Sequence, residues 1–194
     1  MGSASSIDER VIQIKITLKG VSKPPVWRRI LVPAGIRLDH FHDAIQAAMG
    51  WLDYHMHVFS AEAGEYGVPD PDLGHRDERQ ITLARVLQGS GDRLIYTYDF
   101  GDDWDHELAF EQEVPAEPGA VYPRCVAGKG ACPPEDCGGP WGYMDLRAVL
   151  ADPGAESHDE MLEWLGLQHA GEFDPAAFDV DAVNESLAAL RAVR

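Results

Sequence analysis

The segment Leu94–Phe110, LIYTYDFGDDWDHELAF, is the strongest fold signal in the chain because it combines alternating apolar residues with a dense group of acids. Apolar and aromatic side chains recur at every second position in two runs, which are Leu94, Tyr96, Tyr98 and Phe100, then Trp104, His106, Leu108 and Phe110. A period of two on both sides of a glycine-containing turn is typical of a β-hairpin. The sequence therefore predicts a hairpin with one aromatic face.

The register of this hairpin determines what its tip carries. A three-residue loop, 101–103, pairs Phe100 with Trp104 and keeps both apolar runs on one face, whereas a two-residue turn would set acids opposite aromatics. The three-residue loop also places Asp99 directly opposite Asp105. Like charges in that arrangement destabilise a sheet by up to about 1 kcal/mol unless a cation, a proton or a basic side chain neutralises them. We therefore expect a site at the tip.

The rest of the chain predicts an α+β fold. Period-two and helical spacing indicate strands at 11–18, 26–32 and 55–61, and helices at 38–49, 81–87, 141–150, 158–165 and 180–190. A charged surface excursion is expected at 62–79, and an irregular Pro/Gly/Cys segment at 113–140. Ser157 is expected to begin one helix with a capping box, and Gly166 to end it.

This element order matches, by analogy, a β-grasp-like mixed sheet with one packed helix, followed by an irregular segment and a helical C-terminal portion. In that layout the strand at 94–99 is central, parallel to the first strand and beside the strand 55–61, and its aromatic face rests on the helix 38–49. We expect a leader at 1–10 and a single domain at 11–194. Residues 11–114 would form its sheet-rich half and residues 115–194 its acidic, helical half.

Composition indicates a soluble globular protein. The chain has 194 residues, is 45% hydrophobic and contains no run of 18 apolar residues, so no membrane segment is expected. Three cysteines and the absence of a secretory signal favour the cytoplasm. The start Met1–Ser6 fits a loose N-myristoylation pattern, but a flexible leader is the simpler interpretation.

Charge is distributed unevenly along the chain. Residues 1–97 contain 12 acidic and 11 basic residues, for −1, whereas residues 98–194 contain 21 and 5, for −16. Such a surface repels phosphate backbones, so direct nucleic-acid binding is not expected. A cation or a basic protein partner suits it better, although the excess acid could simply keep the protein soluble.

One group of polar residues fits a divalent metal such as Zn, Mg or Mn. Imidazole and carboxylate ligands are available at the hairpin and on the strand 55–61, where two histidines share a face; the candidates are His55, His57, Asp99, Asp102, Asp105 and His106. Their spacing matches no EF-hand loop, and His106 alternates onto the aromatic face. A solvated acidic turn with a hydrogen-bonded core histidine therefore remains an alternative.

The irregular segment offers two further candidates. Cys125, Cys132 and Cys137, spaced Cys-x6-Cys-x4-Cys, could hold structural zinc with a histidine, or could simply be small buried residues. Near the start of the helix 141–150, a stiff loop could accept a ligand or pack against the hairpin; its candidate residues are Glu135, Asp136, Gly138 and Gly139.

Five motifs in order closely resemble the plasmid pRiA4b ORF-3-like family: LKGVSKPPVWRRILVPAG, IQAAMGWLDYHMHVF, YTYDFGDDWDHEL, YPRCVAGKGACPPEDCGGPWGY and FDPAAFDVDAVN. The resemblance runs from Val11 to Leu190 and implies a compact α+β domain. It implies little about activity, because the family is functionally uncharacterised. Some members travel on insertion sequences with a resolvase-like label, yet neither a serine nor a tyrosine recombinase signature is visible here.

We expect a non-enzymatic binding or accessory module with an acidic surface that contacts a basic partner and binds a metal. The competing hypothesis is a metal-dependent hydrolase built from His55, His57, Asp99, Asp105 and His106, with a metal-bound water as nucleophile. Recombination is the least favoured alternative. The sequence does not indicate the oligomeric state.

Overall fold

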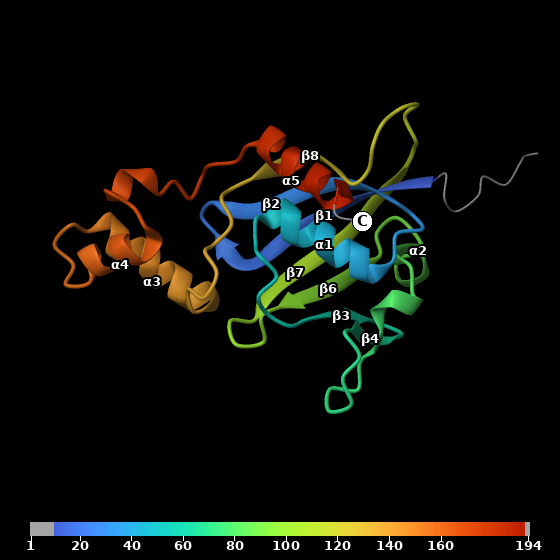
Figure 1. The fold of residues 1–194 in the computed structure, drawn as a ribbon, viewed down its shortest axis with the longest axis horizontal. Coiled ribbons are helices and arrows are strands. Elements are labelled where there is room, and N and C mark those ends of the chain that lie inside the picture. The colour runs from blue at the N-terminus through green and yellow to red at the C-terminus, as the bar shows by residue number, and fades with distance from the viewer. Residues whose placement is uncertain (1–9, 193–194) are drawn as a thin grey trace, which may run out of the picture.

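The computed structural model describes residues 10–192 and has the predicted α+β fold (Figure 1). One mixed sheet has the strand order β5-β4-β3-β6-β7-β1-β2-β8. The strands are β1 (Arg10–Ser22), β2 (Pro25–Pro33), β3 (His57–Ala61), β4 (Gly64–Gly67), β5 (Arg76–Asp77), β6 (Arg93–Tyr98), β7 (Trp104–Pro115) and β8 (Arg124–Lys129). The helices are α1 (Leu38–Met49), α2 (Leu83–Val86), α3 (Gly139–Ala151), α4 (His158–Leu165) and α5 (Val180–Ala192), with 3-10 turns η2 (Glu78–Gln80) and η3 (Ala170–Glu172). The expected leader and the N-myristoylation pattern lie outside the described residues, apart from Arg10.

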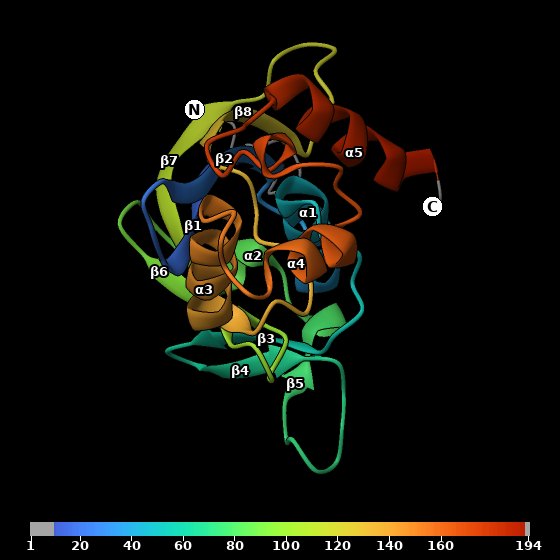
Figure 2. The ribbon, with the colours of Figure 1, turned by 90° about the vertical axis from the view of Figure 1, so that its left-hand side faces the viewer.

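The core lies between the sheet and α1. The apolar spacing of α1 buries Phe41 and Ile45 completely against the alternating side chains of β1 and β6, such as Ile14 and Tyr96. Figures 1 and 2 show α5 beside α1 on the same face of the sheet. The expectation that the aromatic face rests on this helix is confirmed. Leu52, which fits the helical spacing, instead lies beyond the helix and is 62% exposed.

The β6–β7 hairpin forms, but its expected register is wrong. Tyr98 pairs with Trp104, so the loop has five residues, 99–103, rather than three. Each residue faces a partner two positions away from the expected one, which preserves the alternation and the aromatic face. Asp105 therefore lies opposite Thr97, whose hydroxyl donates to the Asp105 carboxylate over 2.6 Å. No pair of carboxylates faces each other across this hairpin.

The longer loop has a local cause. Asp99 adopts a left-handed conformation (φ 58°), and its Oδ1 accepts hydrogen bonds from the backbone N–H groups of Gly101 (2.9 Å) and Asp102 (3.3 Å). The Asp103 N–H also donates to the Asp99 carbonyl over 2.7 Å. Aspartate tolerates this conformation and closes such turns with its own side chain. The chain thus leaves β6 at Tyr98, and Phe100 lies in the loop, 40% exposed.

Strand order differs from the β-grasp analogy at one position. β6 is central and pairs with β3, as expected, but β7 lies between β6 and β1. Because β1 and β6 are each antiparallel to β7, they run in the same direction without being neighbours. β3 begins at His57, so His55 precedes the strand. The surface excursion at 62–79 also includes β4, β5 and the start of η2.

The segment 113–140 is less irregular than expected. β7 continues to Pro115, and β8 adds an edge strand to β2. The side chain of Asn184 on α5 holds β8 in place: it accepts from the Cys125 N–H (2.8 Å) and donates to the Cys125 carbonyl (2.9 Å). This strand depends on a contact 59 residues away in the chain, which local propensity cannot reveal.

The helices α3 and α4 lie at the end of the sheet that carries the β1–β2 turn and the β6–β7 loop (Figure 1). α4 begins after Ser157 and ends at Gly166 (φ 68°), as predicted, but the Ser157 side chain makes no capping hydrogen bond. No helix among the described residues has the length and apolar character needed to cross a bilayer.

Candidate metal-binding site

Three segments meet at the tip of the β6–β7 hairpin. His55 comes from the connection between α1 and β3, Asp99 from the hairpin loop, and Asp136 from the loop before α3. The His55 Nε2 atom lies 3.0 Å from an Asp136 oxygen and 3.6 Å from an Asp99 oxygen, and the three donor atoms are within 4.8 Å of one another. Two predicted metal residues and one residue of the predicted loop therefore converge.

The His55 Nε2 atom is buried and has no hydrogen-bond partner among the described residues. Asp99 is itself 7% exposed; its Oδ1 atom closes the turn, whereas its Oδ2 atom faces the imidazole. Asp136 is open to solvent, with a side chain 64% exposed. The site thus has a buried floor and an open side through which an ion can enter.

The loop that carries Asp136 is fixed by its neighbours. The Glu135 carboxylate accepts from the Leu52 N–H (2.9 Å) and from the Tyr98 hydroxyl (3.1 Å). The Trp51 indole N–H donates to the Pro133 carbonyl over 3.0 Å. These bonds tie the loop to both other segments that form the site, so His55, Asp99 and Asp136 are held by one connected set of contacts.

Two glycines bring the same loop against the hairpin. Asp102 accepts from the Gly138 N–H over 3.0 Å. Gly139 has φ +68°, and a Cβ atom there would lie 2.3 Å from the Asp102 carbonyl oxygen. Only glycine fits this position without a shift of the backbone. The loop therefore packs against the hairpin, which is the simpler of its two predicted roles, and also contributes Asp136 to the site.

The distances suit a shared ion. Two ligand atoms bound to one metal at about 2.1 Å lie about 3.0 Å apart in octahedral geometry and about 3.4 Å apart in tetrahedral geometry. The imidazole–carboxylate distances of 3.0 and 3.6 Å are close to these values. One imidazole and two carboxylates form a mixed nitrogen and oxygen set that suits Zn²⁺ or Mn²⁺.

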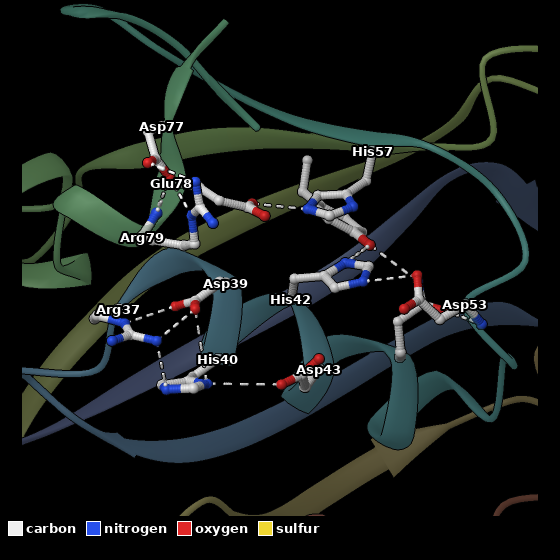
Figure 3. Close-up of polar contacts among 12 residues, drawn as sticks. Arg37, Asp39, His40, His42, Asp43, Asp53, His57, Asp77, Glu78 and Arg79 are labelled. Atoms are coloured by element: carbon white, nitrogen blue, oxygen red, sulfur yellow. Dashed lines mark hydrogen bonds and ion pairs between the residues drawn. The ribbon is translucent and has the colours of Figure 1, made fainter. Parts of the chain in front are cut away.

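A second polar cluster lies at α1, with His42 and His57 buried and Asp53 exposed (Figure 3). The rings of His42 and His57 stack with centroids 3.5 Å apart and planes 6° apart. His42 Nε2 lies 2.9 Å from Asp53, and His57 Nε2 lies 2.8 Å from Glu78. One donor atom each from His42, Asp53 and His57 also fall within 4.8 Å of one another, so proximity alone would admit an ion here.

Hydrogen bonds already occupy His42 in this cluster. Gln46 Oε1 accepts from the Asp53 N–H, so its amide nitrogen faces the Tyr96 hydroxyl at 2.9 Å. Having accepted that bond, Tyr96 donates its own proton to His42 Nδ1 over 2.7 Å, and His42 then donates from Nε2 to Asp53. This hydrogen bond holds the pKa of Asp53 below its ordinary value.

The stacked geometry also disfavours an ion between the two rings. Imidazole lone pairs lie in the ring plane, and parallel planes 3.5 Å apart do not converge on one metal at about 2.1 Å. We therefore assign the His42 cluster to the structural core. His55, Asp99 and Asp136 remain the candidate ligands.

The other predicted metal residues lie elsewhere. His57 is engaged with Glu78 and His42 and does not face the same group as His55. Asp102 holds the loop before α3, and Asp105 accepts from Thr97. The predicted five-residue hydrolase centre is therefore not assembled, because its histidines point into separate environments.

His106 belongs to the core. It is completely buried, with Nδ1 3.2 Å from the Tyr96 carbonyl oxygen, as the core-histidine alternative proposed. Burial lowers the pKa of His106 to about 4 because the charged imidazolium loses its hydration. It is therefore neutral at neutral pH.

In the described part of the chain, two groups of three residues could hold a metal ion, and neither group includes a cysteine. Cys125 lies on β8 and is buried, and its thiol donates to the Ala127 carbonyl over 3.4 Å. Burial raises the pKa of Cys137 to about 12 and also raises that of Cys132, so both thiols stay protonated at neutral pH. These properties fit small packing residues.

Sequence reasoning missed the buried network around His42. His42 and Gln46 are four residues apart, on the same side of an otherwise apolar helix face, and this was the available signal. Glu78 gives no such signal, because it lies in a charged, irregular stretch. Asp136 was predicted as a loop residue but not as a partner of His55.

Known proteins resemble this chain in sequence, and one solved structure shares its fold. The family model for plasmid pRiA4b ORF-3-like proteins matches residues 10–182. The uncharacterized protein y4hQ of Sinorhizobium fredii is 40% identical over 180 residues, which is 91% of this chain and 90% of that protein. The crystal structure of a protein of unknown function from Methanosarcina mazei Go1 superposes with a TM-score of 0.79 at 37% identity, covering 90% of this chain and 96% of that one. The chain belongs to the plasmid pRiA4b ORF-3-like family.

Proposed function

We propose that this protein is a non-enzymatic binding module that holds one divalent metal ion, Zn²⁺ or Mn²⁺, through His55, Asp99 and Asp136. One observation carries the proposal: the buried His55 Nε2 atom lacks a hydrogen bond yet lies 3.0 and 3.6 Å from two carboxylate oxygens. Neither contact has hydrogen-bond geometry, and a metal ion between these atoms would be a ligand partner for all three groups.

The charge of the surrounding chain supports cation binding. Residues 98–194 carry a net charge of −16 and include both carboxylate ligands, so the local field attracts cations. The same field suits a basic protein partner, for which a bound metal would provide a fixed contact point. Two positive-φ aspartates supply the oxygens, and asparagine tolerates the same backbone conformation. Charge can therefore be removed from either ligand without strain.

Titration calorimetry of tag-free protein with ZnCl₂ and MnCl₂ tests the proposal. We expect one ion per chain, with affinity reduced at least tenfold in His55→Ala, Asp99→Asn and Asp136→Asn. His40→Ala and Asp103→Asn are the matched controls, because His40 is a partly exposed histidine outside both clusters and Asp103 is a positive-φ aspartate of the same loop. Equal affinity in all variants, or no binding by the wild type, would refute the site.

Metal-dependent hydrolysis is the second candidate function. Three protein ligands with an open position are typical of catalytic zinc sites, and Asp136 leaves this site open to solvent. Zinc-dependent cleavage of p-nitrophenyl acetate that disappears in His55→Ala but persists in His40→Ala would favour an enzyme. Zinc binding without turnover would favour the binding module.

A further inference from the structure

A groove of about 690 Å³ lies between the β1–β2 turn, α3 and the segment 170–175. We call it the hairpin–helix groove; its lining residues include Val21, Lys23, Tyr143, Arg147, Leu150 and Phe173. Its volume is in the range of small-molecule sites, roughly 300–1,000 Å³. The candidate metal ligands His55, Asp99 and Asp136 are not among its lining residues, so the groove is separate from the candidate metal site.

The floor of the groove is apolar and fixed. Val21, Tyr143 and Leu150 are all less than 10% exposed, so their positions are set by core packing. The Phe173 ring packs edge-on against Tyr143 with centroids 6.4 Å apart. An apolar ligand body would therefore meet preformed aromatic and aliphatic surface without ordering new side chains.

Two positive charges line the same groove. The Arg147 guanidinium lies over the Tyr143 ring, 5.6 Å from its centroid, and donates a hydrogen bond to the Lys23 carbonyl oxygen. In the described part of the chain, neither Lys23 nor Arg147 forms an ion pair, and no aspartate or glutamate lines the groove. Acidic residues outnumber lysines and arginines 33 to 16 in this protein, so two cations without acidic partners are an unexpected lining.

We propose that the hairpin–helix groove binds a small organic anion with an apolar body, such as a medium-chain carboxylate. The carboxylate would pair with Arg147, whose planar guanidinium is already oriented by the Lys23 carbonyl and the Tyr143 ring. The hydrocarbon chain would cover Tyr143, Leu150 and Phe173. Charge complementarity selects an anion over a neutral ligand, and the apolar floor selects an aliphatic or aromatic body over inorganic phosphate.

Titration calorimetry with sodium octanoate, full-length protein and no added metal tests this proposal. We expect saturable binding of one octanoate per chain, at least tenfold weaker binding of 1-octanol, and no binding of inorganic phosphate. Arg147→Gln should weaken octanoate binding at least tenfold. Arg124→Gln, which removes an arginine that pairs with Glu117 elsewhere in the chain, should leave binding unchanged.

A second variant protects the test against loss of folding. Met144 lines the groove and is 51% exposed, so Met144→Glu adds a negative charge without disturbing the core. We expect it to melt near the wild-type temperature and to bind octanoate at least tenfold more weakly. Equal affinity for octanoate and octanol, unchanged binding in both groove variants, or no octanoate binding at millimolar concentration would overturn the proposal.

Discussion

Replacing His106 by leucine should reduce the sensitivity of this protein to mild acid. The buried His106 imidazole has its pKa lowered from 6.5 to about 4, so between these values the unfolded chain binds a proton that the folded chain rejects. Stability from this residue is therefore present above pH 6.5 and is lost as the pH falls toward 4. Between pH 7 and pH 5, the shift implies a loss of about 2 kcal/mol. Leucine has no titrating group, so the variant should escape this part of the loss.

Urea unfolding at pH 7 and pH 5 measures the effect. The wild type should lose about 2 kcal/mol more unfolding free energy over this interval than His106→Leu, whatever the stability of the variant at pH 7. Parallel pH dependence of wild type and His106→Leu would show that the burial argument for His106 is wrong.

Two further predictions test how the loop that carries Asp136 is held against its neighbours. Gly166, at the end of α4, is the comparison for Gly139. Gly166→Ala should cost about 1 kcal/mol, because its φ of +68° is strained for alanine but the space is open. Gly139 has the same φ, and alanine there would also place its Cβ 2.3 Å from the Asp102 carbonyl oxygen. Urea unfolding of Gly139→Ala should therefore show a clearly larger loss of unfolding free energy, and equal losses in the two variants would contradict this contact. A double-mutant cycle of Tyr98→Phe and Glu135→Ala should give a coupling free energy of about 1 kcal/mol, and additive effects would show that their hydrogen bond does not stabilise the loop.

Much of the fold follows from local pattern. Alternation on β6 and β7, helical spacing on α1 and the glycine after α4 are each determined within a few residues, so sequence predicts them. The hairpin register was wrong because Asp99 closes a five-residue loop with its own side chain, an arrangement with no unique sequence signature. β8 was missed because Asn184, far along the chain, holds it in place.

The site was predicted in part for the same reasons. The sequence predicts His55 because it would share a strand face with His57, and Asp99 because the expected register sets it opposite Asp105; the structure has neither arrangement, yet it brings His55 and Asp99 together. His57 and His106 do not join them, because β3 begins only at His57 and because the rings of His57 and His106 are buried in the core. Asp136 joins them only because Glu135 and two glycines fix its loop against the hairpin, and such a contact between segments depends on tertiary packing.

An anomalous difference map from crystals of the tag-free protein grown with ZnCl₂ tests the metal proposal most directly. We expect one zinc peak within about 2.2 Å of His55 Nε2 and of one carboxylate oxygen each from Asp99 and Asp136. A peak between His42 and Asp53, a peak at the cysteines, or no density beside a hydrogen-bonded His55 would contradict it.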